Sequence, residues 1–388
     1  MDFYTLDNQL RRIAIFDQYE SLIWTERYAA GGDFQMEILS ERNTREAMTV
    51  GTFCTVSDTK RVCVIETVED VVSSGGKRTL RLSGRGLESV FFSDRAATVN
   101  KGLSDGLTWD RTATPAGIAR ALFNDFVVDT SLPDKLPFYT PGNLFTPGSI
   151  PEPPEVITMS LENDSLYASL VKICEMYNLG FRLARNDDAS QLYFDVYTGD
   201  DRTTLQKINT AVVFSPELDN LSGTSEVVSN ASQKNVAYVA TKFAFGTVYA
   251  DGWDVSSAVG FARRVLYVKA EDIELETGPE LSAAIRQRGL EELSKNRTII
   301  AFDGEIPQHD TYEYGPGKNY DLGDLIEVRN ADGLATSMRV VEHIRVSDSS
   351  GIKAYPTLVS ELLVTQGSWL SFAANGYWDF AIGEWVDA

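Results

Sequence analysis

The feature that most limits how this chain can fold is a strand-and-turn unit that occurs twice, 276 residues apart. Residues 64–77 align with residues 340–353 without a gap, and six of the fourteen aligned positions are identical. Both copies begin with valine-rich strand sequence and reach a Ser-Ser-Gly turn. Chance similarity between two such hairpins is the alternative. A true duplication predicts a pseudo-symmetric β protein, and pseudo-symmetry usually serves assembly.

A similar opening precedes each copy, residues 50–56 in the first and residues 322–328 in the second. The distance from opening to unit differs by four residues, which a hairpin turn absorbs easily. In the second opening, Gly323 permits a tight turn, and Asp324 can accept hydrogen bonds from nearby backbone before the strand begins. The first opening has Thr52 in place of Asp324. We expect a structural role here and no direct function.

Composition and charge narrow the class of protein. The 388 residues are 43% hydrophobic and 11% aromatic, so we expect a folded protein of about two to four domains. Short apolar runs separated by 29 glycines indicate a mainly β protein. The net charge of -21 argues against tight binding of DNA or RNA, because such binding needs lysine and arginine at the phosphates. The charge serves either solubility alone or a surface past which DNA moves without sticking.

No export or membrane signal is visible. No apolar run approaches the roughly 18–20 residues that span a bilayer, so we predict no membrane span. The first residues lack a basic region followed by an apolar stretch, which predicts no signal peptide and synthesis in a cytoplasm. Three cysteines, Cys54, Cys63 and Cys174, are expected to be reduced thiols, although Cys54 and Cys63 could face each other across a hairpin.

Five segments follow from the pattern along the chain. Residues 1–100 contain about six short alternating strands, which close most readily into a barrel or sandwich, here a first β-barrel. Residues 101–156 combine a helix with a loop that holds seven of the thirteen prolines. Residues 157–230 predict a small α+β module. Residues 231–365 return to strands, interrupted by one helix, and predict a second β-barrel. Residues 366–388 form a Trp-rich tail.

Three helices are predicted. One begins at Thr114, which is followed by proline. A second runs over residues 166–177, capped by Asn163 or Asp164, and lies on a hairpin of residues 180–197. A third opens with a capping box at residues 277–280.

No catalytic site is predicted. His343 aligns with Thr67 of the first repeat and therefore has the position of an ordinary strand residue. His309 and Asp310 are adjacent, so on a strand their side chains point to opposite faces. The short motifs of nucleotide-binding, zinc and serine-hydrolase sites are missing from the sequence. A glycosidase, which needs only two carboxylates, is not excluded by this search.

No metal or cofactor site is predicted either. The acidic pairs at residues 187–188 and 200–201, and Asp251 with Asp254, lack the regular alternation of a calcium loop. We interpret them as solvated turns. Catalytic, cofactor-binding and metal-binding residues are therefore all expected to be none.

The tail is the one interaction feature that the sequence offers. Trp369, Trp378 and Trp385 place half of the six tryptophans in the last 20 residues, among glycines. Tryptophan provides a large contact area at a low cost in side-chain entropy. The alternative is that the tail folds back onto its own domain.

Several segments carry a resemblance to a known family, and they are residues 19–24 with 32–34, 80–87, 180–182 with 196–203, 213–221, and 322–326. Together they resemble the tail-tip or baseplate hub proteins of long-tailed bacteriophages (siphophages), the minor tail protein family. Their order along the chain is more specific than any one of them.

The resemblance implies a mainly β protein with α+β insertions. It also implies two pseudo-repeated tube-type β-barrels and a helix-on-hairpin module in each chain. Three chains would form a homotrimer with six barrels, which joins a sixfold tail tube to threefold tip parts. The expected partners are the distal tail protein ring, the tape measure protein, and tip or receptor-binding proteins. The implied location is the virion, at the tail tip, after synthesis in the host cytoplasm. DNA would pass through the lumen during ejection without specific binding.

The resemblance also bears on enzymatic activity. Some family members carry a C-terminal extension that cleaves peptidoglycan, and no such extension follows the predicted second barrel here. We therefore expect no enzymatic activity.

Two other functions stay open. A distal tail ring protein would need one barrel per chain, so the internal repeat speaks against it. A carbohydrate-binding or carbohydrate-active protein would need aromatic residues and carboxylates in one groove, which the sequence alone does not reveal.

Overall fold

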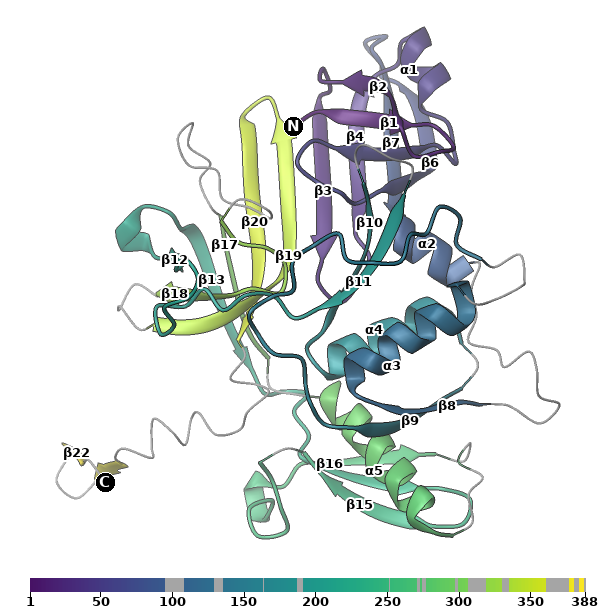
Figure 1. Cartoon of the computed structure of the whole chain (residues 1–388). Coiled ribbons are helices and arrows are strands. Elements are labelled where there is room, and N and C mark those ends of the chain that lie inside the picture. Colours follow the sequence, from purple (N-terminus) through teal and green to yellow (C-terminus); the bar gives the residue numbers. More distant parts are fainter. Residues whose placement is uncertain are drawn as a thin grey trace. The chain divides into compact units, whose positions relative to one another are not determined.

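The computed structural model describes most of the chain (Figure 1). The described residues are 1–94, 108–128, 135–162, 164–186, 191–250, 252–270, 273, 277–296, 299–305, 319–329, 335–360, 377–379 and 384–386. They divide into two compact units, each described by itself. Unit 1 comprises residues 1–225 and 303–358, and unit 2 comprises residues 226–302 and 359–388.

A 13-stranded sheet dominates the strand content. Its strands pair in the order β13-β17-β20-β19-β3-β4-β7-β6-β5-β1-β2, and β18 joins β19 and β12. The bounds in its first part are β1 Phe3–Leu6, β2 Arg12–Phe16, β3 Ser21–Arg27, β4 Asp33–Leu39, β5 Phe53–Val56, β6 Cys63–Val72 and β7 Arg78–Gly86. The others are β12 Val213–Phe214, β13 Ser222–Ser229, β17 Ile299–Glu305, β18 Leu325–Arg329, β19 Ala335–Asp348 and β20 Gly351–Ser360.

The sequence repeat corresponds to two three-strand meanders, β5-β6-β7 and β18-β19-β20. In the part of the chain that the structure describes, these meanders do not form two separate closed barrels. Instead β19 pairs antiparallel with β3, from Glu342 opposite Arg27 to Asp348 opposite Ser21, so both meanders belong to one sheet (Figure 1). The path through the described strands stays open between β13 and β2. The prediction of two closed barrels is corrected to a strand-rich fold with one large mixed sheet.

Backbone hydrogen bonds show that the two openings are equivalent. The N–H groups of Gly51 and Gly323 donate to the carbonyls of Ile65 and Val340, at 2.7 and 2.8 Å. The N–H groups of Ile65 and Val340 donate back across the turn, at 2.9 and 3.0 Å. Both glycines have a positive φ, 88° and 92°. These bonds align Ile65 with Val340, one residue away from the sequence alignment.

A second layer in unit 1 consists of helices on a hairpin. It contains α2 Leu87–Asp94, α3 Pro115–Phe123, α4 Leu166–Met176, β10 Gly180–Arg185 and β11 Leu192–Tyr197. Beside them lie the hairpin of β8 Thr108–Ala113 with β9 Ile157–Glu162 and a short π-helix, Asn124–Val128. The predicted helix on a hairpin is confirmed.

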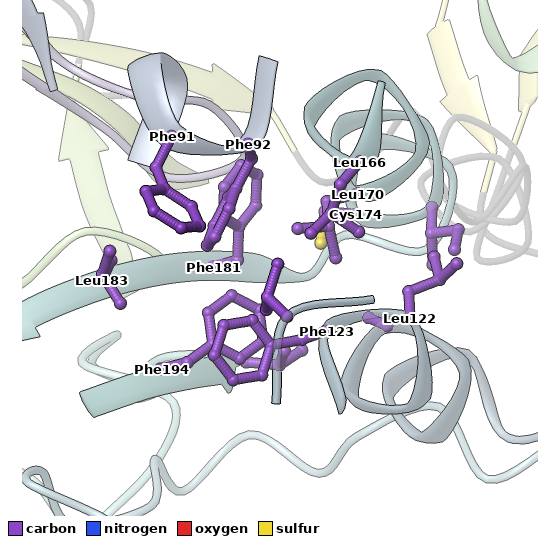
Figure 2. Close-up of a cluster of buried hydrophobic side chains, with 14 of the residues drawn as sticks. Phe91, Phe92, Leu122, Phe123, Leu166, Leu170, Cys174, Phe181, Leu183 and Phe194 are labelled. Carbon is purple, nitrogen blue, oxygen red and sulfur yellow. The ribbon is translucent and has the colours of Figure 1, made fainter. Parts of the chain in front are cut away.

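The helices α2, α3 and α4 all contribute to the core of this layer, and α2 was not predicted (Figure 2). Phe92 of α2 packs edge-on against Phe123 of α3 and Phe194 of β11. The Phe123 and Phe194 rings stack, with centroids 4.0 Å apart and 8° between the planes. Leu166 and Leu170 of α4 lie in the same cluster. Such ring pairs add about 0.5–1.5 kcal/mol beyond the burial of their apolar area.

The helix starts test the capping predictions. Thr114 caps α3, where its side chain accepts the N–H of Gly117. Ser165, and not Asn163 or Asp164, caps α4. The capping box at residues 277–280 is wrong, because α5 Pro279–Ser294 begins after Gly278, which has a φ of 106° and makes no side-chain cap. Proline at the first helical position still sets its start.

Unit 2 contains a three-stranded sheet with α5 on one face. The strands are β14 Val236–Ala240, β15 Phe245–Tyr249 and β16 Val265–Lys269, in the order β15-β14-β16. Helix and sheet lie very close, since a Cβ at Gly246 would meet Ile285, and one at Gly289 would meet Val248, both at 2.5 Å. Two further strands, β21 Tyr377–Asp379 and β22 Glu384–Val386, form a hairpin.

Other sequence predictions concern unpredicted elements, the cysteines and membrane spans. The elements that were not predicted include β1, α2 and the short α1 Arg42–Ala47. Cys54 and Cys63 pair directly across β5 and β6, and all three cysteines are buried free thiols. Within the described ranges, no helix has both the length and the apolar character to cross a bilayer.

Candidate functional site

Three of the segments that carry the family resemblance meet in one place in unit 1, which we call the charged junction. They are residues 180–182, 196–203 and 322–326. The junction also receives side chains from β3, β19, α2 and the segment that leads into β6. It brings together parts of the sequence up to about 320 residues apart, so it fixes the arrangement of unit 1.

Arg61 occupies the inner part of the junction. Its guanidinium lies 2.9 Å from a Glu88 oxygen and 3.7 Å from a Glu26 oxygen, and these side chains are almost fully buried. It also donates to the carbonyl of Arg27 at 3.0 Å. Arg345 of β19 reaches Glu26 from the other side at 3.2 Å. Removal of one member would leave a buried charge without its partner, which typically costs 3–5 kcal/mol.

The two carboxyls differ in their electrostatic environment. Burial alone would raise the pKa of Glu26, but Arg345 and Arg61 outweigh it, and the pKa is lowered. Burial dominates at Glu88, whose pKa is raised although Arg61 opposes the shift. Glu26 therefore keeps its negative charge to lower pH than Glu88 does.

Arg182 connects the hairpin to the second repeat. Its guanidinium lies between two rings, 3.4 Å from the Phe145 centroid and 4.1 Å from that of Tyr197. It pairs with Asp195 at 2.9 Å and with Asp321 at 3.4 Å. The planar guanidinium permits stacking and ion pairing at the same time, so lysine would not replace it.

Asp324 anchors the segment that follows β11. Its carboxylate accepts the N–H of Asp200 at 2.7 Å, the N–H of Asp321 at 2.8 Å and the Arg202 guanidinium at 2.7 Å. The structural role that the sequence predicted for Gly323 and Asp324 is confirmed. The cross-chain contacts were missed, because they depend on a segment 122 residues away.

The backbone crossings at the junction require glycine. A Cβ at Gly199 would lie 2.3 Å from the backbone of Gly323, and one at Gly323 would lie 2.4 Å from the Tyr28 ring. The Tyr28 hydroxyl is held by the carbonyls of Asn178 and Tyr197, at 2.9 and 3.0 Å. The segments therefore pack at backbone contact distance.

Beyond the junction the chain forms an ordered surface loop, residues 203–209, which we call the apolar loop. Leu205 and Ile208 are 87% and 86% exposed at its tip. The Gln206 amide oxygen accepts the N–H groups of Ile208 and Asn209, and its nitrogen donates to the carbonyls of Thr203 and Asn209.

Further bonds fasten the apolar loop to the junction. The Asn209 amide donates to Ser149 and to the carbonyl of Asp201, at 2.8 and 2.9 Å. Thr204 bonds to Glu327 of β18. Two exposed aliphatic side chains on a loop that is already ordered have the properties of an interaction site. The sequence signal was two aliphatic residues among polar turn residues, which the strand and helix patterns did not identify.

The structure places some of the histidines and acidic pairs weighed from the sequence. His343 lies buried on β19, with Nδ1 2.9 Å from the Tyr320 hydroxyl, so its predicted position on a strand is confirmed. Asp200 and Asp201 are not solvated turn residues, because Arg202, Ser149 and Thr203 hold them in the junction.

The other acidic positions give a mixed outcome. Asp254 does form a turn, in which Ser256 and Ser257 lower its pKa to about 2. His309, Asp251 and residues 187–188 lie outside the described residues. Among the residues that the structure describes, no group of three potential ligands is placed to hold a metal ion.

Solved structures of other proteins have a similar fold. The chain aligns with the tail protein from Neisseria meningitidis MC58 at a TM-score of 0.57 and 12% identity, over 93% of this chain and 97% of that one. It aligns with the 43 kDa tail protein of prophage MuSo2 from Shewanella oneidensis at 0.53 and 14% identity, over 94% and 98%. The fold is that of phage tail proteins.

The family model for Siphovirus ReqiPepy6 Gp37-like protein matches residues 2–358, and the chain belongs to this family. The family is one of siphovirus proteins, and the fold that the chain shares with solved tail proteins agrees with this assignment. The resemblance to siphophage tail proteins that the sequence indicated is confirmed. No curated protein matches the chain.

Proposed function

We propose that the chain is a structural hub protein of the phage tail tip and that it assembles as a homotrimer. Each trimer joins the sixfold tail tube to the threefold parts of the tip and continues the channel through which DNA leaves. Its neighbours are the distal tail ring, the tape measure protein and the tip or receptor-binding proteins. The protein acts by assembly and has no enzymatic activity.

The repeated meander carries this proposal. Each chain has two β parts with the same turn, and the bonds of Gly51 recur at Gly323. Three chains therefore supply six similar parts, the number that a sixfold tube requires. The pairing of β19 with β3 supports a fixed spacing of the two parts, because both belong to one sheet.

The remaining features of unit 1 fit a structural role in the tail. The charged junction connects the meanders to the helical layer through ion pairs that are largely buried. The apolar loop, anchored to β18 through Thr204, supplies an ordered contact for a neighbouring subunit. We place it at a subunit interface of the ring.

Native mass by light scattering during gel filtration tests the proposal. We expect a trimer, about three times the 42.9 kDa of the chain. The measurement is repeated with the distal tail protein of the same phage present, because ring closure can require the neighbouring ring. A monomer under both conditions overturns the hub proposal. A hexamer favours a distal tail ring protein in its place.

A further inference from the structure

The open face of the unit 2 sheet carries an aromatic patch, which we call the aromatic face. α5 covers the opposite face through Ile285 and Leu281. On the open face the register places Phe245, Ala240 and Lys269 in one row. Thr247, Tyr238 and Tyr267 form the next row.

The aromatic side chains on this face have large exposed fractions. Phe245 and Tyr267 are each 60% exposed, and Phe261 on the adjacent loop is fully exposed. Seven of the eighteen exposed large hydrophobic side chains in the described part of the chain lie within residues 243–267. A concentration of this kind marks a surface that binds a partner.

Basic side chains border the aromatic face. Lys269 belongs to its first row, beside Ala240. Arg263 lies 5.6 Å from the centroid of the Tyr238 ring and donates to its hydroxyl. An aromatic and acidic partner is complementary to this surface.

The C-terminal segment, residues 366–388, has that composition. It contains six aromatic residues, three carboxylate side chains, and no lysine or arginine. Its two strands, β21 and β22, have three residues each, with Trp378 opposite Trp385. A hairpin of this size is marginally stable by itself in water and needs a surface to pack against. The sixteen residues from 361 to 376 reach at most about 55 Å, so the connection is long enough for docking within one chain.

We propose that the C-terminal segment docks on the aromatic face of its own chain and covers Phe245 and Tyr267. The tail is then a built-in cover for an apolar binding surface. This proposal does not depend on the trimeric hub, because donor and acceptor belong to one chain.

Hydroxyl-radical footprinting of the full chain tests the docking. The comparison variant carries Trp369→Ser, Trp378→Ser and Trp385→Ser, which keeps the chain length. We expect oxidation of Phe245 and Tyr267 to be about threefold or more faster in the variant, because a tethered segment covers its site most of the time. Phe138 and Leu218, exposed side chains of unit 1, are the internal controls and should not change. Addition of a synthetic peptide of residues 366–388 to the variant should restore the protection.

Three results overturn the proposal. The first is equal oxidation of Phe245 and Tyr267 in both proteins. The second is protection that disappears on dilution together with a fall in native mass, which assigns the tail to a second copy. The third is protection that appears only after another tail protein or a host polysaccharide is added, which assigns the aromatic face to that partner.

Discussion

At the scale of single residues, equivalent positions of the repeat have different surroundings. Gly51 and Gly323 share a positive φ and the same backbone bonds. A Cβ at Gly51 would meet nothing within 4 Å, whereas one at Gly323 would meet the held ring of Tyr28 at 2.4 Å. The opening of the first copy faces solvent at this point, whereas the opening of the second copy lies in the charged junction.

This pair provides a matched test. We expect Gly51→Ala to lower the free energy of unfolding by about 1–2 kcal/mol, the cost of a positive φ for an L-residue. Gly323→Ala should cost about 1–3 kcal/mol more, because the added methyl overpacks the junction. Urea denaturation of both variants measures the difference. Equal losses would show that Tyr28 moves aside freely.

His343 gives a pH prediction. Burial, with the nearby Arg345 charge, lowers its pKa to about 3, from about 6.5 in the unfolded chain. As the pH falls below 6.5, the unfolded state binds a proton that the folded state does not, so stability decreases toward pH 3. The loss from this group is about 1 kcal/mol between pH 6.5 and 5.5. The variant His343→Gln lacks this titrating group, so the unfolding free energy of the variant should depend less steeply on pH by that amount. Parallel pH curves for the two proteins would exclude this assignment.

At the scale of elements, the two meanders join the sheet differently. In the first copy β7 pairs with β4, while in the second copy the 14-residue β19 pairs with β18 near its start and with β3 near its end. The central hairpin β3-β4 therefore lies between the two copies. Both copies of the repeat therefore belong to one continuous sheet, and they cannot be separated without breaking the pairing of its strands.

The apolar loop is the element to test for assembly. Leu205→Asp with Ile208→Asp places charges at an exposed tip, so we expect thermal stability to stay within about 0.5 kcal/mol of wild type. The native mass should fall from trimer to monomer, because buried charge opposes association. Leu218→Asp, at another exposed leucine of unit 1, is the control and should leave the trimer intact. An intact trimer in the double variant would remove the loop from the interface.

Local elements were predictable and their pairing was not. The pattern placed a hairpin at residues 180–197, where β10 and β11 lie, and Thr114 with Pro115 located the start of α3. The prediction of two closed barrels was wrong, because the partner of β3 lies more than 300 residues away in the sequence. The sequence of a strand does not specify which strand it pairs with. The charged junction was missed for the same reason. Arg61, Glu88 and Arg345 have no spacing that links them before the fold brings them together.

At the scale of the whole molecule, the net charge of -21 opposes the binding of DNA. Several positive side chains in unit 1 already form ion pairs with carboxylates, as Arg61, Arg182 and Arg202 do. We expect the purified protein to give no gel shift with duplex DNA, even at low salt, where phosphate contacts are strongest. A salt-dependent shift would contradict the hypothesis that DNA moves past this surface without sticking.

The pairing of β19 with β3 also has a consequence during synthesis on the ribosome. β3 ends at Arg27, and β19 begins at Ala335, about 300 residues later. At about 5–20 residues per second, the first strands wait about 15–60 s before their partner emerges. Throughout that time one edge of β3 has unpaired backbone groups, the kind of edge that recruits strands from other chains. The protein is therefore most vulnerable to aggregation while it is still a nascent chain. Slower translation lengthens the time during which the edge of β3 is unpaired.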